Sequence, residues 1–419
     1  MCHLLVKYAI SAGVKAGSAF AAVLVTVLVS RVMPQDEAGL FLLFLTICSV
    51  LSTLCQFGLD IPVLRRLSST RDLIFVNDVL FRALLWVSLG ASVIVFFGLV
   101  AGGLILNGFL YDERLGPVLI VGLPSVLFLS LSLIYSKAYQ SRGWIASSYL
   151  YETLGVNLVL VVTLSVALLL NRSIASSASN LAVVYALASF VVFIVAAYVW
   201  WWNFGRFHML TLSDRAMFKA GREVFAATCM ALLVNWSGIL VASVFVLPER
   251  IAELAAAQRV SMLVAFILVV ANMVVAPKFA RLWVTDQLGL LERLVKITSR
   301  VMIFVASVVL FSVFVFAEDI MGLFGAGFKD SSALLVILSI GQFVNVATGS
   351  VGMLLNMSGH ERDFRRVTSF SGPLAFLLSV VGAAYWGIFG AAIATAVSLG
   401  VQNVLALFMV RKRLGFWTV

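Results

Sequence analysis

Long apolar runs separated by short polar segments follow one another along nearly the whole chain. They occupy residues 8–31, 38–59, 80–107, 117–139, 148–170 and 179–203, and then 223–247, 252–281, 296–317, 331–356, 367–386 and 388–410. A helix needs about 20 apolar residues to cross the hydrocarbon core of a bilayer. The pattern therefore predicts twelve transmembrane helices in two sets of six. We expect an N-terminal bundle at 1–203, a cytoplasmic linker at 204–222 and a C-terminal bundle with a short tail at 223–419.

Composition agrees with this class of protein. The chain of 419 residues is 62% hydrophobic and 11% charged, whereas soluble domains are about 45–50% apolar and about 25% charged. The net charge of +10 does not indicate a nucleic-acid partner, because the basic residues lie in short segments between apolar runs. That placement is typical of the topology signal in inner membrane proteins.

The same basic residues predict an orientation. With the N-terminus in the cytoplasm, 22 of the 29 lysine and arginine residues fall on the inner side. Six fall on the outer side, and Lys15 remains inside the first run. Because inner loops carry the excess of positive charge, we expect both termini of a multi-pass protein to be cytoplasmic.

The two halves resemble each other at matching positions. Val32-Met33-Pro34 aligns with Val246-Leu247-Pro248 at a shift of 214, and Gly143 aligns with Gly359 at a shift of 216. Because six helices cross the membrane an even number of times, both halves begin on the same side of the membrane. We therefore expect two pseudo-symmetric six-helix bundles, related by an axis along the membrane normal, around a central cavity.

Three further stretches carry a resemblance to a known family. They are the turn Arg31–Phe41 with Phe57-Gly58-Leu59 and Arg65-Arg66, the segment Ile320–Leu338, and the segment Tyr385–Ala396. In order and spacing they resemble the polysaccharide-repeat, or lipid-linked oligosaccharide, flippases of the multidrug/oligosaccharidyl-lipid/polysaccharide (MOP) exporter superfamily. The resemblance implies two all-α bundles that rock to expose the cavity alternately to each side. It also implies carriage of undecaprenyl-diphosphate-linked glycan repeats to the outer leaflet for surface polysaccharide synthesis, beside a polysaccharide polymerase as partner.

Charged residues inside the apolar runs are the candidates for substrate binding. Lys15 lies in the first run and Arg259 lies in the run 252–281. A charge at such depth is costly unless it meets water or a partner, and lysine and arginine both bind phosphate groups. We expect these two residues to line the cavity, together with Gln258, Asn235, Gln342 and Asn345. The alternatives are snorkelling to the headgroups for the two cations and helix–helix hydrogen bonds for the amides.

A second set lies near the inner face. Arg65, Arg66 and Arg82 form a cytoplasmic rim that attracts an anionic headgroup, or anchor the topology. Asp60, Asp78 and Glu152 either pair with these arginines or carry coupling ions such as protons or sodium. Trp200, Trp201 and Trp202 are predicted to form an interfacial belt.

The sequence lacks the motifs of several enzyme and metal-binding classes. It contains no GxxxxGK[ST] loop for ATP and no DxD pair for glycosyl transfer. None of its four cysteines forms a CxxC pair, so we expect no metal centre, no cofactor and no enzymatic activity.

Two alternative functions remain. A cation-coupled multidrug exporter of the same superfamily usually carries an aspartate in its first helix, whereas residues 8–31 contain Lys15 and no acid. A membrane glycan polymerase or ligase carries a large outer loop, and the longest outer segment here, 318–331, is short. The flippases of the peptidoglycan precursor usually have two further helices.

Overall fold

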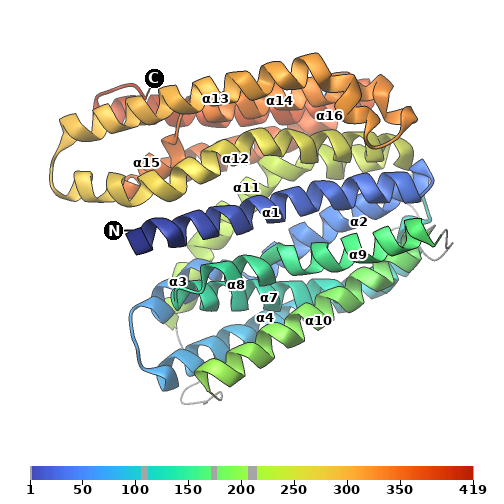
Figure 1. Ribbon diagram of the computed structural model, residues 1–419, viewed down its shortest axis with the longest axis horizontal. Helices are drawn as coiled ribbons and strands as arrows, with labels where there is room; N and C mark the ends of the chain where they lie inside the picture. Colours follow the sequence, from blue (N-terminus) through green and yellow to red (C-terminus); the bar gives the residue numbers. More distant parts are fainter. Residues whose placement is uncertain (1, 105–111, 171–176, 206–214, 419) are drawn as a thin grey trace. The chain divides into compact units, whose positions relative to one another are not determined.

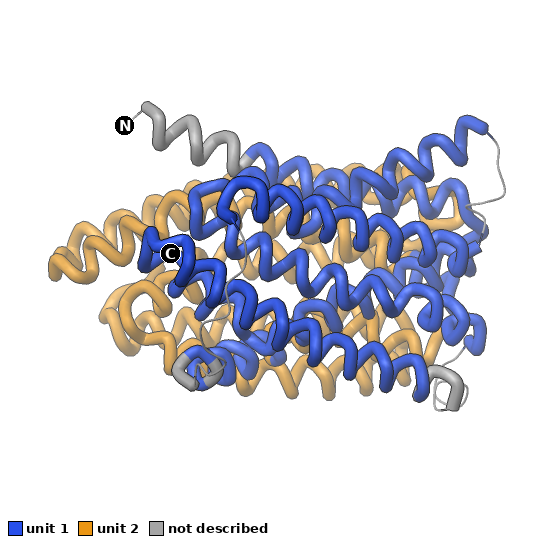
Figure 2. Tube along the Cα trace, turned by 90° about the horizontal axis from the view of Figure 1, so that it is seen from below, with its two compact units in different colours: residues 1–229, 247–252 blue, residues 230–246, 253–419 orange. Residues whose placement is uncertain are grey.

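The computed structural model is built from helices throughout the residues that it describes, which are 2–104, 112–170, 177–205 and 215–418. The chain forms two compact units (Figure 2). Unit 1 comprises Met1–Cys229 with Leu247–Ala252, and unit 2 comprises Met230–Val246 with Glu253–Val419. Most of the expected linker, residues 206–214, lies outside the described residues, and α11 (Arg215–Phe245) begins directly after it.

Unit 1 contains the helices of the first half of the chain. They are α1 (Cys2–Val32), α2 (Gln35–Leu54), α3 (Asp60–Ser68), α4 (Leu73–Leu104), α6 (Leu115–Gly122), α7 (Pro124–Ser141), α8 (Ile145–Tyr149), the π-helical turn η1 (Leu150–Leu154), α9 (Gly155–Leu169) and α10 (Ala178–Phe204). Figure 1 shows α1 alongside α9, and α7 grouped with α4 and α10; each of these pairs is in contact.

Unit 2 holds the later helices. They are α12 (Pro248–Val284), α13 (Leu288–Gly322), the 3-10 turn η3 (Ala326–Ser331), α14 (Ser332–Ala347), α15 (Val351–Met357) and α16 (Glu361–Leu414). The first turn of α12 belongs to unit 1, and α11 passes from unit 1 into unit 2 at Met230.

The all-helical membrane fold expected from the apolar runs is confirmed. Within the described residues, ten helices are long and apolar enough to cross a membrane, or eleven if the bent pair α6 and α7 is one span. The 54-residue α16 breaks at Gly387, where φ is 56° and ψ is −133°. A helix of that length would measure about 80 Å if straight, so its two halves must be separate crossings. That division is consistent with twelve spans.

Glycines allow the two halves of α16 to pack closely. A Cβ atom added at Gly390 would lie 1.9 Å from the backbone oxygen of Gly382, and a Cβ at Gly382 would lie 2.5 Å from the backbone oxygen of Gly390. The helix backbones therefore touch beside the turn at Gly387. Membrane helices use small residues in this way because lipid provides little hydrophobic drive for their association.

The positions that align between the two halves adopt the same local structure. Gly143 follows α7 and Gly359 follows α15, with φ values of 78° and 76°. In each case the next residue donates its N–H to a carbonyl five residues earlier, Trp144 to Tyr139 and His360 to Leu355. This is the hydrogen bond of a Schellman motif, whose left-handed residue is usually glycine. The repeat in the sequence is thus also a repeat of a helix ending.

Aromatic residues form the centre of unit 1 where α7 meets α10. Tyr135, Tyr139 and Trp200 are buried, the Tyr139 hydroxyl donates to the Ala196 carbonyl at 2.8 Å, and Trp200 Nε1 donates to Asn77 Oδ1 at 2.9 Å. The prediction of an interfacial belt was therefore wrong for Trp200, since a buried indole finds its partner inside the protein. Trp201 and Trp202 are exposed as a belt requires.

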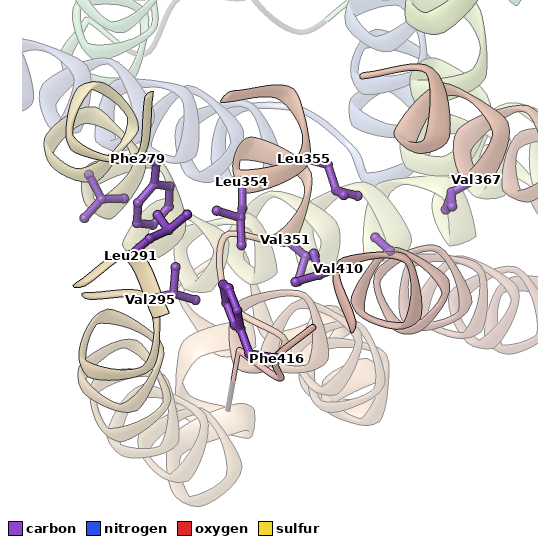
Figure 3. Close-up of a cluster of buried hydrophobic side chains, with 11 residues drawn as sticks. Phe279, Leu291, Val295, Val351, Leu354, Leu355, Val367, Val410 and Phe416 are labelled. Carbon is purple, nitrogen blue, oxygen red and sulfur yellow. The ribbon is translucent and has the colours of Figure 1, made fainter. Parts of the chain in front are cut away.

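A buried apolar cluster joins several helices of unit 2 (Figure 3). It joins Phe279 of α12, Leu291 of α13, Leu354 of α15 and Val410 of α16 to Phe416, which follows α16. The segment after α16 is held in addition by Thr418, whose hydroxyl donates to the Thr348 carbonyl at 2.7 Å. This segment therefore covers the break between α14 and α15.

Candidate functional site

A carboxylate lies beside a lysine inside the helices of unit 1. Glu152 on η1 has its Oε2 atom 3.9 Å from Nζ of Lys137 on α7, and the two side chains are 25% and 23% exposed. The same Oε2 accepts a hydrogen bond from Ser136 at 3.2 Å, and Ser136 also pairs with Ser148 of α8 at 2.9 Å. Glu152 is therefore held by α7 on one side.

Lys15 joins this group from α1. Its Nζ atom lies 4.7 Å from the ring centroid of Tyr149, a cation–π contact, and its charge interacts with both Glu152 and Lys137. One turn along α1, Ser18 pairs with Thr153 at 2.5 Å. We call Lys15, Lys137, Tyr149 and Glu152 the Lys–Glu cluster.

The local backbone explains how Glu152 reaches its position. The Gly155 N–H bonds to the Leu150 carbonyl five residues earlier, as in a π-helix. A Cβ atom on residue 155 would lie 2.9 Å from that carbonyl oxygen, so glycine permits the wide turn. Single π turns inside α-helices are frequent at functional sites. Here the turn carries the acid of the Lys–Glu cluster.

The Lys–Glu cluster has an excess of positive charge when Lys15, Lys137 and Glu152 are all charged. Two ammonium groups share one carboxylate, so one positive charge remains for an external anion. The ammonium group of lysine binds phosphate groups as a point charge. Protonation of Glu152 would raise the positive charge further. The arrangement can therefore bind an anion, exchange a proton, or do both.

Lys137 lies near the end of α7, where α3 also packs. The Arg142 guanidinium, just beyond α7, donates to the carbonyls of Leu67 and Thr70 and so ties the end of α3 to the end of α7. Arg65 is exposed on α3 and Arg66 is half-buried. The two predicted rim arginines thus lie at the same end of unit 1 as Lys137.

The predicted rim residue Arg82 has a different environment. It is buried, as is Asp78 one turn earlier on α4, and its Nη2 atom lies 2.5 Å from Asp78 Oδ2. Arg82 and Asp78 therefore form a buried ion pair within α4. Asp60 begins α3, where the positive end of the helix dipole favours an acid.

The candidates of unit 2 fall into two pairs. Gln258 on α12 is buried and donates to the Asn235 carbonyl of α11 at 2.6 Å, while the Asn235 amide donates to Ala231 of its own helix at 2.7 Å. On α14, the Asn345 amide donates to Gln342 at 3.3 Å. The hydrogen bond from Gln258 to Asn235 joins two helices, as the alternative of helix–helix contacts expects. The hydrogen bonds of the Asn235 and Asn345 amides stay within one helix. Arg259 is half-buried beside Gln258, and its role stays a prediction.

Two contacts escaped the sequence analysis. Glu253 on α12 is buried and accepts a hydrogen bond from Ser331 at 2.5 Å. In the Lys–Glu cluster, Lys137 was only one of the 22 basic residues assigned to the inner side, and Tyr149 was not singled out. The serines at 136 and 148, in otherwise apolar runs, were the available signal for this site.

An ion pair also organises the segment before α6. The Arg114 guanidinium hydrogen-bonds to Asp112 at 2.8 Å and to Asp36 of α2 at 2.7 Å. The hydrogen bond from Arg114 holds the pKa of Asp112 below its ordinary value. Because Arg114 is half exposed, solvent screens the pair and limits its contribution to stability.

With the geometry described, comparison with known proteins decides the family. A sequence profile described as "Polysaccharide biosynthesis protein" matches residues 4–283, well over half of the chain. The chain belongs to this family. The resemblance inferred from its motifs is thereby confirmed, and the family match covers α1, α7, η1 and hence the whole Lys–Glu cluster.

One curated relative of this chain comes from Haloferax volcanii. It is described as the probable low-salt glycan biosynthesis flippase Agl15, and it is 23% identical over 392 residues, covering 90% of this chain and 77% of the relative.

Solved structures share the fold at low identity. An inward-facing multidrug resistance MATE family transporter of the MOP superfamily matches with a TM-score of 0.75 at 16% identity, covering 95% of this chain and 94% of the other. The lipid II flippase MurJ, in an inward closed conformation, matches with a TM-score of 0.75 at 13% identity, covering 96% and 87%. The chain therefore has the fold of the MOP transporters.

Proposed function

We propose that this protein flips a polyprenyl-linked oligosaccharide from the cytoplasmic to the outer leaflet of the cell inner membrane. In the form that the family resemblance implies, the lipid is undecaprenyl diphosphate and the glycan is a repeat unit of a surface polysaccharide. The two units alternate between inward and outward access, and both termini are cytoplasmic. The protein acts as a transporter and not as an enzyme.

The Lys–Glu cluster is the observation that carries this proposal. It places two lysines inside a membrane bundle whose family is that of polysaccharide biosynthesis proteins. A diphosphate is the anionic part of the proposed substrate, and the uncompensated charge of Lys15 and Lys137 suits it. Arg65 on the exposed face of α3, at the same end, would attract the headgroup from the cytoplasmic leaflet.

Glu152 is the candidate for ion coupling in this proposal. It is the acid that contacts a lysine of the cluster, whereas Asp78 is buried against Arg82. A proton on Glu152 would strengthen anion binding, and its loss would favour release. An inside-negative potential also drives an outward-moving anion, by about 2.3 kcal/mol per charge per 100 mV.

Transport by purified protein tests the function directly. Liposomes would hold a fluorescent polyprenyl-diphosphate oligosaccharide, and an impermeant quencher would report its arrival in the opposite leaflet. We expect movement that depends on the folded protein and is absent from liposomes with heat-denatured protein. A protein that leaves this lipid in place but extrudes organic cations would instead be a MATE-type exporter.

A further inference from the structure

An apolar groove runs along the surface of unit 2 between α14 and the second half of α16. Its hollow has a volume of about 460 Å³. Gly341, Ala396 and Gly400 form its floor, and Ile340, Val397 and Val404 are exposed along its walls. The proposed anion site in unit 1 does not use it.

Small residues create the hollow. A Cβ atom at Gly341 would lie 2.7 Å from Ala396 Cα, so α14 and α16 approach closely at that point. At Gly400 the situation is reversed, because an added Cβ would meet only Val344 Cγ1 at 3.8 Å. Gly400 therefore leaves open space, and the β-branched walls around it are stiff. A stiff preformed groove loses little entropy when it binds a ligand.

The length of the groove matches one leaflet of a bilayer. From Ala396 to Leu405 it follows α16 for about 14 Å, and half of the hydrocarbon core is about 15 Å. Ala396 also lies about 14 Å beyond the break at Gly387, near the middle of the membrane. In the proposed orientation, the groove therefore lies in the cytoplasmic leaflet.

A positive charge lies beyond the cytoplasmic end of the groove. Lys412 is exposed, and it follows Leu405 by two turns and Val401 by three, which keeps it on the groove side of α16. Its neighbours are engaged: Arg413 pairs with Asp363 at 2.6 Å, and Arg411 donates to the Gly415 carbonyl. Lys412 is therefore the cation placed to meet a phosphate whose chain occupies the groove.

We propose that this groove binds the isoprenoid chain of a polyprenyl phosphate from the cytoplasmic leaflet, with the phosphate at Lys412. The inference rests on the proposed function, because that function supplies a polyprenyl-linked substrate. It adds a site for the lipid chain in unit 2, separate from the anion site in unit 1. The chain would then be retained at the surface while the glycan enters the protein.

Native mass spectrometry of the full protein in detergent, with three probe lipids, tests the site. The probes are a polyprenyl phosphate, a polyprenol of equal length, and dioleoyl phosphatidic acid. We expect Gly400→Leu, which fills the hollow, to weaken polyprenyl phosphate binding about tenfold, since buried methylenes contribute most of the affinity. Gly400→Ala is the matched control and keeps wild-type binding. Lys412→Gln weakens binding of the phosphate and leaves polyprenol binding unchanged.

Three results would overturn the proposal. One is wild-type binding by Gly400→Leu, or by Val404→Trp at the exposed wall if the leucine variant does not fold. Another is equal binding of dioleoyl phosphatidic acid with equal loss in the variants, which identifies an ordinary phospholipid. The third is a dimer that Gly400→Leu dissociates, which identifies a second copy of this chain. Failure of the flippase proposal is separate, because probe binding is measured without a glycan and without transport.

Discussion

Glu152 and Lys137 approach each other from the two helical segments on either side of the turn at Gly143. Their Oε2 and Nζ atoms are 3.9 Å apart, and Glu152 occupies a π-helical turn. This separation is at the outer limit of an ion pair, and both groups retain partial exposure. The pair is therefore arranged to exchange partners more than to stabilise the fold.

Glu152→Gln tests that interpretation. We expect a loss of less than about 1 kcal/mol in unfolding free energy, because partly exposed ion pairs contribute little. Removing the acid leaves Lys15 and Lys137 without their countercharge, so a polyprenyl diphosphate should bind more tightly while its turnover falls. Binding titration and the flipping assay measure the two effects. Glu292→Gln is the control, since it breaks a comparable pair with Lys296 on α13; identical behaviour of the two variants would contradict the role of Glu152.

The buried pair of Asp78 and Arg82 should behave in the opposite way. Removing one partner of a buried pair leaves an uncompensated charge and costs about 3–5 kcal/mol, so we expect Asp78→Leu to lower the unfolding temperature strongly. The double variant Asp78→Leu with Arg82→Met should recover most of the loss. Thermal unfolding in detergent measures both. A stable single variant with impaired ion-driven flipping would show that Asp78, and not Glu152, couples transport.

Gly58 and Gly143 both have left-handed backbone conformations, and comparing their alanine variants distinguishes backbone strain from steric overlap. Gly58 has φ of 68°, and a Cβ there would lie 2.3 Å from the Gly221 carbonyl oxygen, whereas Gly143 has φ of 78° and open space. We expect Gly143→Ala to cost about 1 kcal/mol from backbone strain alone. Gly58→Ala should cost clearly more, because α11 must also move. Equal shifts in unfolding temperature would show that the Phe57-Gly58 turn does not pack on α11.

The orientation of the protein in the membrane is tested by labelling. In a variant without its native cysteines, Glu113→Cys and Glu361→Cys place single thiols at exposed positions. An impermeant maleimide added to intact cells should label residue 113, and residue 361 should react only after the cells are opened. Labelling of both from the same side would contradict the orientation that the charge distribution predicts.

The positions of the membrane helices were predictable because apolar length and basic loop residues act locally. The halves of α16 were separated correctly at Gly387, and Gly143 and Gly359 have the equivalent helix endings that their alignment indicated. The break between α6 and α7 falls at Pro124, the first residue of α7, so a proline within the run 117–139 was the signal for it. The π turn after Tyr149 was not predictable, because no residue type specifies its backbone hydrogen-bonding pattern.

The candidate site was predicted in part. Lys15 and Glu152 were both singled out, but in separate roles, because the interaction between their charges arises from the packing of α1 against η1. Two residues that the sequence pattern placed at the membrane interface are buried inside the protein instead. Trp200 and Arg82 have types and positions that suit the membrane interface, yet each finds a buried partner, Asn77 and Asp78 respectively.

Flipping by charge variants at Lys15 tests the central claim most directly. The assay uses liposomes with the fluorescent polyprenyl-diphosphate oligosaccharide. We expect Lys15→Gln to lower the flipping rate at least about tenfold, because the variant lacks one of the two lysine charges that bind the diphosphate. Lys15→Arg keeps the charge and should retain substantial activity, and Lys296→Gln, which removes a lysine of unit 2, should match wild type. Wild-type flipping by folded Lys15→Gln would contradict the account, because the Lys–Glu cluster would then not bind the anionic linkage.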